Sequence, residues 1–280
     1  ACGARLVFEV RDIWPLTLIE IGGYSPRHPF IRFLQWIEDR AYARADRVVS
    51  NIEGAVEHMA SRGMDRGKFT WVSNGIALNE VENPEPLSPE VAAQIPADGL
   101  RIVYTGTLGA ANALDTLIEA AALLRDLPDV HILLVGQGRA RADLEAQCDA
   151  LGLSNVRFLG PVPKPQVQSV LAACDVCYIG LTDDPLFRFG VSPNKLFDYL
   201  VSGKPVIYGI DSGEFKPVER YNAGLQVPPG DPQALAEAIR RLYAMPKAER
   251  RRMGENGRRA ALAHYDYAQL ARRLEQVLTG

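Results

Sequence analysis

Residues 187–208, FRFGVSPNKLFDYLVSGKPVIY, combine a loop, a short helix and a buried strand, and they decide the expected fold. Ser192 suits an N-cap and Pro193 suits the first helical position, so a helix is predicted to begin there. Gly203 follows the helix and precedes an apolar strand over residues 205–208. Strand, loop, helix and strand in this order are typical of an α/β sheet.

Two charged side chains of this predicted helix are candidates for a nucleotide site. Lys195 lies in the first turn, where a cation and unpaired backbone amides together suit a diphosphate. Asp198 lies about one turn further on, where its carboxylate can accept hydrogen bonds from two ribose hydroxyls. An ordinary helix start with a solvated lysine and a solvated acid explains the segment equally well. The choice between these two interpretations therefore depends on the rest of the chain.

The composition limits the class of protein. The chain has 280 residues, is 47% hydrophobic and 23% charged, and carries a net charge of -3, which is typical of a soluble globular protein. A net negative charge argues against nucleic acid as a main partner. No apolar run approaches the ~18 residues of a membrane span, and the first residues form no signal peptide. We therefore expect a cytoplasmic protein, peripheral at the inner face of the membrane if it contacts one.

Cys174 and Cys177 form a C-x-x-C pair, a spacing that serves redox or zinc chemistry in some proteins. Cys174 is expected to close a helix and Cys177 to lie in the following strand, and no second ligand pair has metal spacing. The pair is therefore predicted to be two small buried residues and not a redox or zinc site.

The chain divides at residues 79–99, where four prolines interleave with five acidic residues and predict a linker. Strands are expected at residues 5–10, 46–50, 69–73, 101–105, 130–135, 156–159, 175–179, 205–208 and 224–227. Helices are expected at residues 29–45, 54–61, 114–125, 140–151, 166–173, 193–202, 215–221, 231–243, 247–264 and 267–278. Six strands alternating with helices over residues 100–245 predict a doubly wound, Rossmann-like parallel sheet.

The helix predicted over residues 29–45 has two interpretations. Its apolar residues have helical spacing, and they are Phe30, Phe33, Leu34, Ile37, Ala41 and Tyr42. Four arginines (27, 32, 40 and 44) accompany three aromatic residues, which suits a lip that touches lipid headgroups. Glu38 and Asp39 interrupt the basic face, so an amphipathic helix packed on a sheet is favoured. His58, in the next helix, is predicted to be a surface residue without a partner.

Ligands of an open α/β sheet bind beyond the carboxyl ends of the strands. Three loops at that edge carry glycines or begin a helix, and they are residues 106–109, 136–138 and 190–194. Glycines let backbone amides approach phosphate oxygens, so three converging loops indicate a nucleotide. None matches G-x-G-x-x-G or the P-loop, which disfavours NAD binding and ATP hydrolysis. Arg11 and Asp12, after the first strand, are either ligand residues or an ion pair that caps a loop.

Five segments of the chain form a recognisable set: VGQG at 135–138, NVRFLG at 155–160, ACDV at 173–176, SPNKLFDY at 192–199 and GKPVI at 203–207. Together they resemble the family 4 retaining glycosyltransferases of the GT-B fold. EVRDIWP at 9–15 is similar to a subgroup that builds bacterial envelope and O-antigen polysaccharides. Asn74-Gly75 falls where these enzymes end their first domain.

The resemblance implies transfer of a sugar from a nucleotide diphosphate to a lipid-linked saccharide acceptor with retention of configuration, and UDP is the expected nucleotide. It also implies that the reaction needs neither a metal nor another cofactor, because the nucleotide sugar is the substrate. The residues expected at the donor are Gly106, Thr107, Gly109, Gly136, Gly138, Val162, Gly190, Ser192, Pro193, Asn194, Lys195, Leu196 and Asp198. Arg11, Asp12 and Lys195 are the expected catalytic residues, and Arg11 stands where many relatives place a histidine. Fixed positive groups would stabilise the diphosphate as it leaves.

The resemblance also implies a division of labour along the chain. Residues 1–78 correspond to the second half of an acceptor-side Rossmann-like domain, as expected of an N-terminally truncated chain. Residues 79–99 correspond to a linker and residues 100–245 to the nucleotide-sugar-binding domain. Residues 246–280 correspond to C-terminal helices that cross back to the first domain.

Two features depart from the family pattern. The family has an acidic pair with seven residues between its members, and counting back from Asp198 reaches Gly190. The loop at 106–109 lacks the usual basic residues, so Lys195 is expected to supply the charge. A non-catalytic nucleotide-sugar-binding or regulatory relative is therefore an alternative. A GT-B sugar-nucleotide epimerase is a further one, but the acids and histidines needed for proton abstraction are not found.

Overall fold

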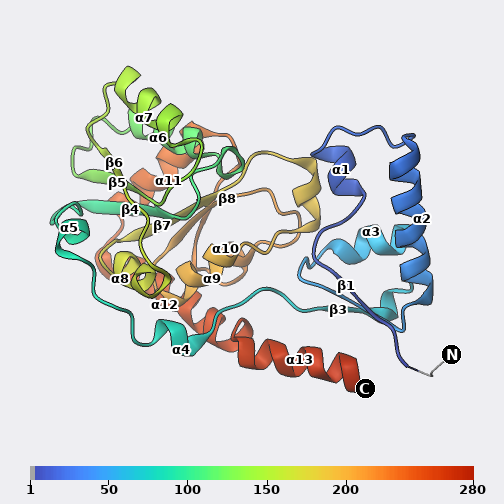
Figure 1. Ribbon diagram of the computed structural model, residues 1–280. Coiled ribbons are helices and arrows are strands. Elements are labelled where there is room, and N and C mark those ends of the chain that lie inside the picture. The colour runs from blue at the N-terminus through green and yellow to red at the C-terminus, as the bar shows by residue number, and fades with distance from the viewer. Residues whose placement is uncertain (1–3) are drawn as a thin grey trace.

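The computed structural model describes residues 4–280, which form two α/β units that lie side by side (Figure 1). Each unit is built on a sheet of parallel strands. The first unit, residues 4–78, contains a three-stranded parallel sheet in the order β1-β2-β3. Its strands are β1 (Val7–Val10), β2 (Arg47–Ser50) and β3 (Phe69–Trp71). Its helices are α1 (Leu16–Glu20), α2 (Pro29–Arg44) and α3 (Ala55–Ser61).

The second unit, residues 100–245, contains a six-stranded parallel sheet in the order β6-β5-β4-β7-β8-β9. Its strands are β4 (Leu100–Thr105), β5 (Val130–Val135), β6 (Val156–Leu159), β7 (Val176–Gly180), β8 (Val206–Gly209) and β9 (Gly224–Gln226). The chain runs outward from β4 to β6, then returns to pair β7 with β4. This reversal of strand order is the point where doubly wound sheets bind their ligands.

Helices cover both faces of the six-stranded sheet, as Figure 1 shows. They are α6 (Leu114–Ala122), α7 (Arg141–Ala150), α8 (Val167–Ala172), α9 (Asn194–Val201), α10 (Pro217–Arg220) and α11 (Pro232–Ala244). One buried cluster joins the sheet to α6, α7 and α11, and another joins it to α8, α9 and α10. The predicted doubly wound sheet is confirmed.

Two C-terminal helices contact both units. They are α12 (Lys247–His264) and α13 (Tyr267–Thr279). The Ile76 amide donates a 2.8 Å hydrogen bond to the carbonyl oxygen of Tyr265, just after α12, and the Ile76 carbonyl oxygen accepts a 3.0 Å bond from the amide of Tyr267, which begins α13. In Figure 1, α13 runs from the second unit toward the first. No helix within residues 4–280 combines the length and apolarity needed to cross a membrane.

Several expectations about individual segments need correction. The stretch between the units contains two short helices, α4 (Leu78–Val81) and α5 (Pro89–Ala92), where the proline pattern predicts at most one. Ser88 caps α5 by accepting a hydrogen bond from the Val91 amide, and Pro89 occupies its first position, so local sequence is sufficient to start this helix.

The prediction that the apolar residues of α2 pack on the sheet is wrong in part. Ile31 and Tyr42 are buried, but Phe30, Phe33 and Ile37 are 48%, 56% and 44% exposed. His58 is also not a surface residue: it is only 9% exposed, and its Nε2 lies 3.2 Å from Glu38 Oε1. A buried carboxylate needs hydrogen-bond partners, and α3 supplies one.

The interpretation of the C-x-x-C pair is confirmed. Cys174 follows α8 and Cys177 lies in β7, and both side chains are buried. Burial raises the pKa of the Cys174 thiol to about 12, which leaves it protonated and unreactive at neutral pH.

Candidate functional site

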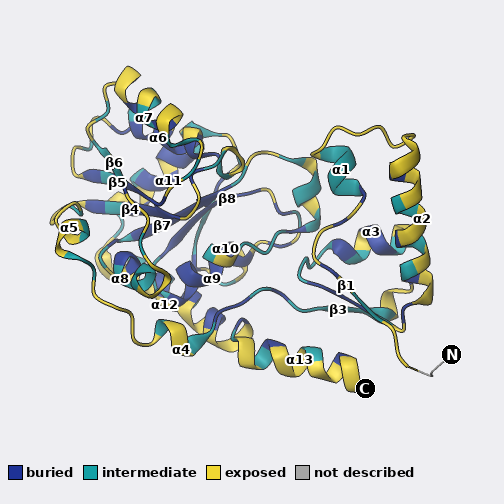
Figure 2. Ribbon diagram, in the orientation of Figure 1, coloured by how far each residue is buried: buried dark blue, intermediate teal, exposed yellow. Residues whose placement is uncertain are grey.

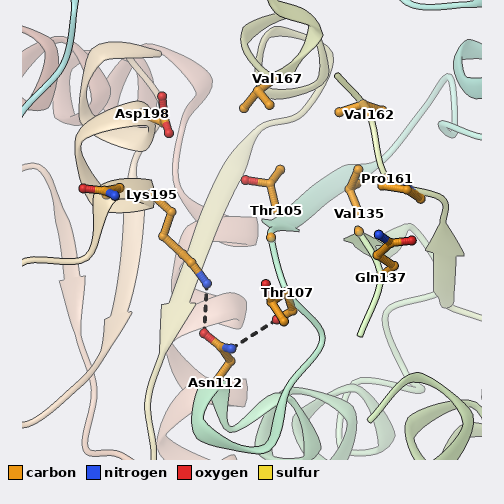
Figure 3. Close-up of a pocket in the computed structure, with 13 residues that line it drawn as sticks. Thr105, Thr107, Asn112, Val135, Gln137, Pro161, Val162, Val167, Lys195 and Asp198 are labelled. Carbon is orange, nitrogen blue, oxygen red and sulfur yellow. Dashed lines mark hydrogen bonds between the residues drawn. The ribbon is translucent and has the colours of Figure 1, made fainter. Parts of the chain in front are cut away.

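A cavity of about 490 Å³ lies at the carboxyl ends of β4, β5 and β6, beside the start of α9 (Figure 3). Its lining residues are Thr105, Gly106, Thr107, Asn112, Val135, Gly136, Gln137, Pro161, Val162, Val167, Asn194, Lys195 and Asp198. We call it the sheet-edge cavity. It adjoins the reversal of strand order between β4 and β7, where ligands of such sheets bind.

Glycines let the loops after β4 and β5 pack backbone against backbone. Gly106 has φ of 135° and Gly136 has φ of 148°, a region that side chains rarely adopt. A Cβ at Gly136 would lie 1.9 Å from the carbonyl oxygen of Gly106. The two loops therefore depend on glycine at both positions, and neither carries a side chain into the cavity there.

Lys195 is the central cation of the sheet-edge cavity. Its Nζ donates hydrogen bonds to Tyr104 Oη at 2.6 Å and to Asn112 Oδ1 at 2.9 Å, and it lies 4.2 Å from the Tyr104 ring centroid. In the part of the chain described, no acid forms an ion pair with it. Desolvation lowers the pKa of Lys195 to about 8. The cavity therefore contains a positioned cation without a counter-ion.

The partners of Lys195 are held in turn by the loop after β4. Tyr104 Oη donates to the carbonyl oxygen of Thr107 at 2.7 Å, and Asn112 Nδ2 donates to the same oxygen at 3.1 Å. Figure 3 shows the line from Lys195 through Asn112 to Thr107. Sequence analysis did not assign Tyr104 or Asn112 to the site, because their relation to Lys195 spans 91 and 83 positions.

Asp198 is the acid of the sheet-edge cavity. Its Oδ1 accepts a 2.6 Å hydrogen bond from Lys164 Nζ, while Oδ2 accepts none from residues 4–280. Desolvation raises the pKa of this carboxyl group, and the Lys164 ammonium opposes that effect. The Asp198 side chain is 11% exposed and that of Lys164 is 54% exposed, so the lysine screens the acid from one side. Sequence analysis missed Lys164, which stands in a proline-rich loop.

The start of α9 differs from the expected one. The helix begins at Asn194, and Pro193 at its N-cap provides no side-chain hydrogen bond. Ser192 is not the cap: its Oγ accepts from the Asn74 amide at 3.0 Å, and its carbonyl oxygen accepts from Asn74 Nδ2 at 2.7 Å. Ser192 thus ties the two units together. The first amides of α9 receive no side-chain cap and remain suited to an anion.

A second cavity, of about 250 Å³, lies between the two units, and we call it the inter-unit cavity. The first unit lines it with Arg11, Asp12, Ile13, Thr17, Asn51 and Ile52. The second unit lines it with Leu186, Phe187, Gly190, Val191, Ser192 and Pro193. Asn51, which sequence analysis missed, has a buried Oδ1 without a hydrogen-bond donor among the described residues.

Direct contacts close the boundary around the inter-unit cavity. Glu20 forms an ion pair with Arg188 at 2.8 Å, and Glu53 forms one with Arg220 at 3.0 Å. The Gly54 amide donates to the carbonyl oxygen of Phe189 at 2.8 Å, and a Cβ at Gly54 would lie 2.5 Å from that oxygen. The segment containing Phe189 is therefore held by both units.

The predicted site residues fall into three groups. The sheet-edge cavity brings together Gly106, Thr107, Gly136, Val162, Asn194, Lys195 and Asp198. The inter-unit cavity contains Arg11, Asp12, Gly190, Ser192 and Pro193. Gly109, Gly138 and Leu196 line neither of these two cavities.

The third group, Gly109, Gly138 and Leu196, contributes to the packing around the sheet-edge cavity and not to its lining. Leu196 is fully buried, so its side chain belongs to the core and not to a ligand surface. A Cβ at Gly138 would lie 2.1 Å from the carbonyl oxygen of Leu108, which explains the glycine by close loop packing. The Gly109 amide donates to Thr107 within the same loop.

Comparison with known proteins shows where similar sequences occur. Residues 99–245, just over half of the chain, match the family model described as "Glycosyl transferases group 1". The "Probable glycosyltransferase WbjE" of Pseudomonas aeruginosa is 26% identical over 248 residues, which cover 85% of this chain and 60% of that protein. The "Lipopolysaccharide core biosynthesis glycosyltransferase LpsE" of Rhizobium meliloti (strain 1021) is 26% identical over 230 residues, 80% of this chain and 61% of that protein. The chain thus spans about 60% of the length of these relatives.

Solved structures show the same fold. Anabaena Alr3699/HepE in complex with UDP and glucose has a TM-score of 0.74 at 21% identity, covering 98% of this chain and 71% of that one. WaaG, "a glycosyltransferase involved in lipopolysaccharide biosynthesis", has a TM-score of 0.73 at 18% identity, covering 99% and 77%. These likenesses confirm the predicted GT-B fold.

Proposed function

Because the chain belongs to the family Glycosyl transferases group 1, we propose that it transfers a sugar from a nucleotide diphosphate to a saccharide acceptor. We propose further that it is a family 4 retaining enzyme of bacterial envelope polysaccharide synthesis. Its donor would be a UDP-sugar and its acceptor a lipid-linked saccharide at the inner membrane face. The observation that carries the proposal is a cation without a counter-ion, Lys195, beside the start of α9.

The diphosphate would bind between Lys195 and the first turn of α9. The amides of Asn194 and Lys195 have no partner within the helix, and the positive end of the helix dipole favours an anion. A diphosphate also favours the protonated form of the Lys195 amine, whose pKa is lowered only by burial. Binding and protonation therefore support each other at this position.

The nucleoside would extend from α9 toward the loop after β6. The free Oδ2 of Asp198 is available to accept hydrogen bonds from ribose hydroxyls. Val135, Val162 and Val167 supply an apolar surface in the same cavity, and Pro161-Val162 supply backbone groups that can recognise a base. The complexes of Anabaena Alr3699/HepE with UDP and with UDP-glucose support the choice of uracil.

Transfer would break the bond between sugar C1 and the diphosphate oxygen, the acceptor oxygen would form the new bond to C1, and the acceptor's hydroxyl proton would pass to the departing diphosphate. Negative charge develops on the departing diphosphate, where Lys195 and the α9 amides are already positioned. These groups would supply the charge stabilisation without a metal. The inter-unit cavity, with Arg11 and Asp12 on one side and residues 190–193 on the other, would hold the acceptor beside the sugar.

One observation favours the alternative of a non-catalytic nucleotide-sugar-binding relative. Gly190 occupies the position of the first family acid, and its φ of 99° is one that an acidic residue rarely adopts. A Cβ there would also lie 3.3 Å from Phe215 Cβ. The backbone at this position is therefore built for glycine, and the chemistry has to proceed without that acid.

The test is release of nucleotide from UDP-, GDP- and ADP-sugars, with and without a lipid-linked saccharide acceptor. We expect acceptor-dependent release of one nucleotide, abolished by Lys195→Met. Tight binding of a nucleotide sugar without any release would instead support the non-catalytic alternative. Failure to bind any nucleotide sugar would contradict both.

A further inference from the structure

The outward surface of α2 carries large exposed apolar side chains, which is unusual for a helix at the edge of a protein. Phe33 is 56% exposed, Trp36 is 55% exposed and Ile37 is 44% exposed. Figure 2 shows α2 exposed along much of its length, at the edge of the first unit that faces away from the six-stranded sheet. Surface helices normally turn such side chains toward the core, and clustered exposed apolar residues mark interaction sites.

The acids of α2 do not lie on this outward surface. Glu38 is 6% exposed, and it accepts a 2.7 Å hydrogen bond from Tyr42 Oη beside His58. Asp39 forms an ion pair with Arg62 at 2.6 Å. Of the two acids that interrupt the basic pattern in the sequence, Glu38 is thus buried and Asp39 is paired with Arg62, so neither neutralises the arginines of α2.

The arginines of α2 remain on the outward surface. Arg32, Arg40 and Arg44 are exposed, and within residues 4–280 none of them forms an ion pair. The Arg40 guanidinium lies 5.2 Å from the Trp36 ring centroid, so cation and aromatic ring share one patch. We call the patch of Arg32, Phe33, Trp36, Ile37, Arg40 and Arg44 the α2 face. It is cationic on a protein whose net charge is -3.

We propose that the α2 face docks on an anionic lipid surface. Aromatic and aliphatic side chains between arginines are the composition of helices that lie in the membrane interface. Phe33, Trp36 and Ile37 would enter the headgroup region while the arginines pair with lipid phosphates. The biological reason for docking, access to a lipid-linked acceptor, rests on the proposed function, but the surface itself does not.

The experiment is co-sedimentation of the full chain with vesicles of phosphatidylcholine alone and with added phosphatidylglycerol. We expect binding only to the anionic vesicles, weakened by salt. Arg40→Glu combined with Arg44→Glu should reduce binding by more than about tenfold, since each arginine contributes about fivefold. Phe33→Ala combined with Trp36→Ala should also reduce it. Equal binding of these variants and the wild-type chain, or no binding to either vesicle, would overturn the proposal.

Matched control variants distinguish vesicle binding through the α2 face from non-specific binding through other exposed hydrophobic residues. Leu262→Ala with Tyr267→Ala removes two exposed hydrophobic side chains from the C-terminal helices, and should leave vesicle binding unchanged. If the α2 face joins two copies of the chain, sedimentation will show a dimer that Phe33→Ala with Trp36→Ala dissociates, and the lipid assignment fails. If the chain binds UDP but no vesicles, the lipid-docking proposal is wrong and the proposed function stands. If it binds anionic vesicles but no UDP, the proposed function is wrong and the docking proposal stands.

Discussion

The sheet-edge cavity and the inter-unit cavity hold their cations in opposite ways. Lys195 is fixed by Tyr104 and Asn112 and has no acid beside it. Arg11 has a side chain that is 69% exposed, and its nearest acid, Glu9, lies 3.8 Å away. The Lys195 ammonium is held by two hydrogen bonds before any ligand arrives, whereas the Arg11 guanidinium is largely exposed to solvent. Preorganisation of this kind is what electrostatic stabilisation requires.

The difference follows from what supports each cavity. The six-stranded sheet has helices on both faces and two buried clusters, and Tyr199 Oη accepts a 2.8 Å hydrogen bond from the Thr105 amide to join α9 to β4. The three-stranded sheet has one smaller buried cluster, and its cavity is completed only by contact with residues 186–193. The proposed donor site is therefore expected to bind its ligand within one unit, whereas the proposed acceptor site is expected to require both.

The largest effect is expected from Lys195→Met. Loss of a charge-assisted contact to the diphosphate should weaken UDP binding by about 100-fold, while binding of uridine, which has no diphosphate, should hardly change. Calorimetric titration measures both. Arg11→Met is the matched control, and its UDP affinity should stay within about twofold of the wild-type value because an exposed cation contributes little. Equal losses in the two variants would refute the contrast between the cavities.

The next effect concerns the acid. Asp198→Ala should weaken UDP binding by ~1.5–3 kcal/mol, the range for hydrogen bonds to a charged group. The same substitution should matter far less for 2′,3′-dideoxy-UDP, which lacks the hydroxyls that Asp198 is proposed to bind. Unchanged affinity for UDP in the variant would remove the ribose assignment.

The pH dependence should follow Lys195. Its pKa of about 8 lies below the ordinary 10.5, so UDP affinity of the wild-type protein should fall as pH rises above about 8, and that of Lys195→Met should not. The stability effect has the opposite sign. Burial disfavours the charged form, so this destabilisation is fully present below pH 8 and is relieved as pH rises toward 10.5. Denaturant titrations of both proteins at pH 7 and 9.5 check this.

The smallest effect concerns the connection between the units. Asn74→Ala removes the hydrogen bond from Asn74 Nδ2 to the Ser192 carbonyl oxygen, while the backbone amide keeps its bond to Ser192 Oγ. It should lower the free energy of unfolding by about 1 kcal/mol. Asn256→Ala, which removes exposed hydrogen bonds to Asn222 and Arg259, should change the free energy of unfolding by less than about 0.5 kcal/mol. Urea unfolding compares them. A larger cost at Asn256 would show that the Asn74 contact does not hold the units together.

Sequence patterns predict local structure well where local residues determine it. The apolar runs Val130–Val135 and Val156–Leu159 and the helix Lys247–His264 have the predicted bounds. The predicted N-cap of α9 is wrong because Ser192 forms hydrogen bonds with Asn74, which lies 118 positions away in the sequence. The helix propensity of residues 187–208 alone cannot predict a contact with so distant a residue.

The same limit applies to the site. Glycine loops and a helix start place Gly106, Lys195 and Asp198 in one cavity, as expected of strand-to-helix loops that share one sheet edge. Lys164 and Tyr104 reach the site only through tertiary packing, so spacing does not reveal them. For α2, periodicity identifies an apolar face but does not say whether that face meets the core or the outside.

The most direct test of the account is calorimetric titration of the wild-type chain with UDP, GDP, ADP and CMP, alongside Lys195→Met and Asp198→Ala. We expect selective binding of one nucleoside diphosphate, with UDP the expected one, and loss or strong weakening of that binding in both variants. Binding of no nucleotide, or binding that both variants retain in full, would contradict the claim that the sheet-edge cavity is a nucleotide diphosphate site.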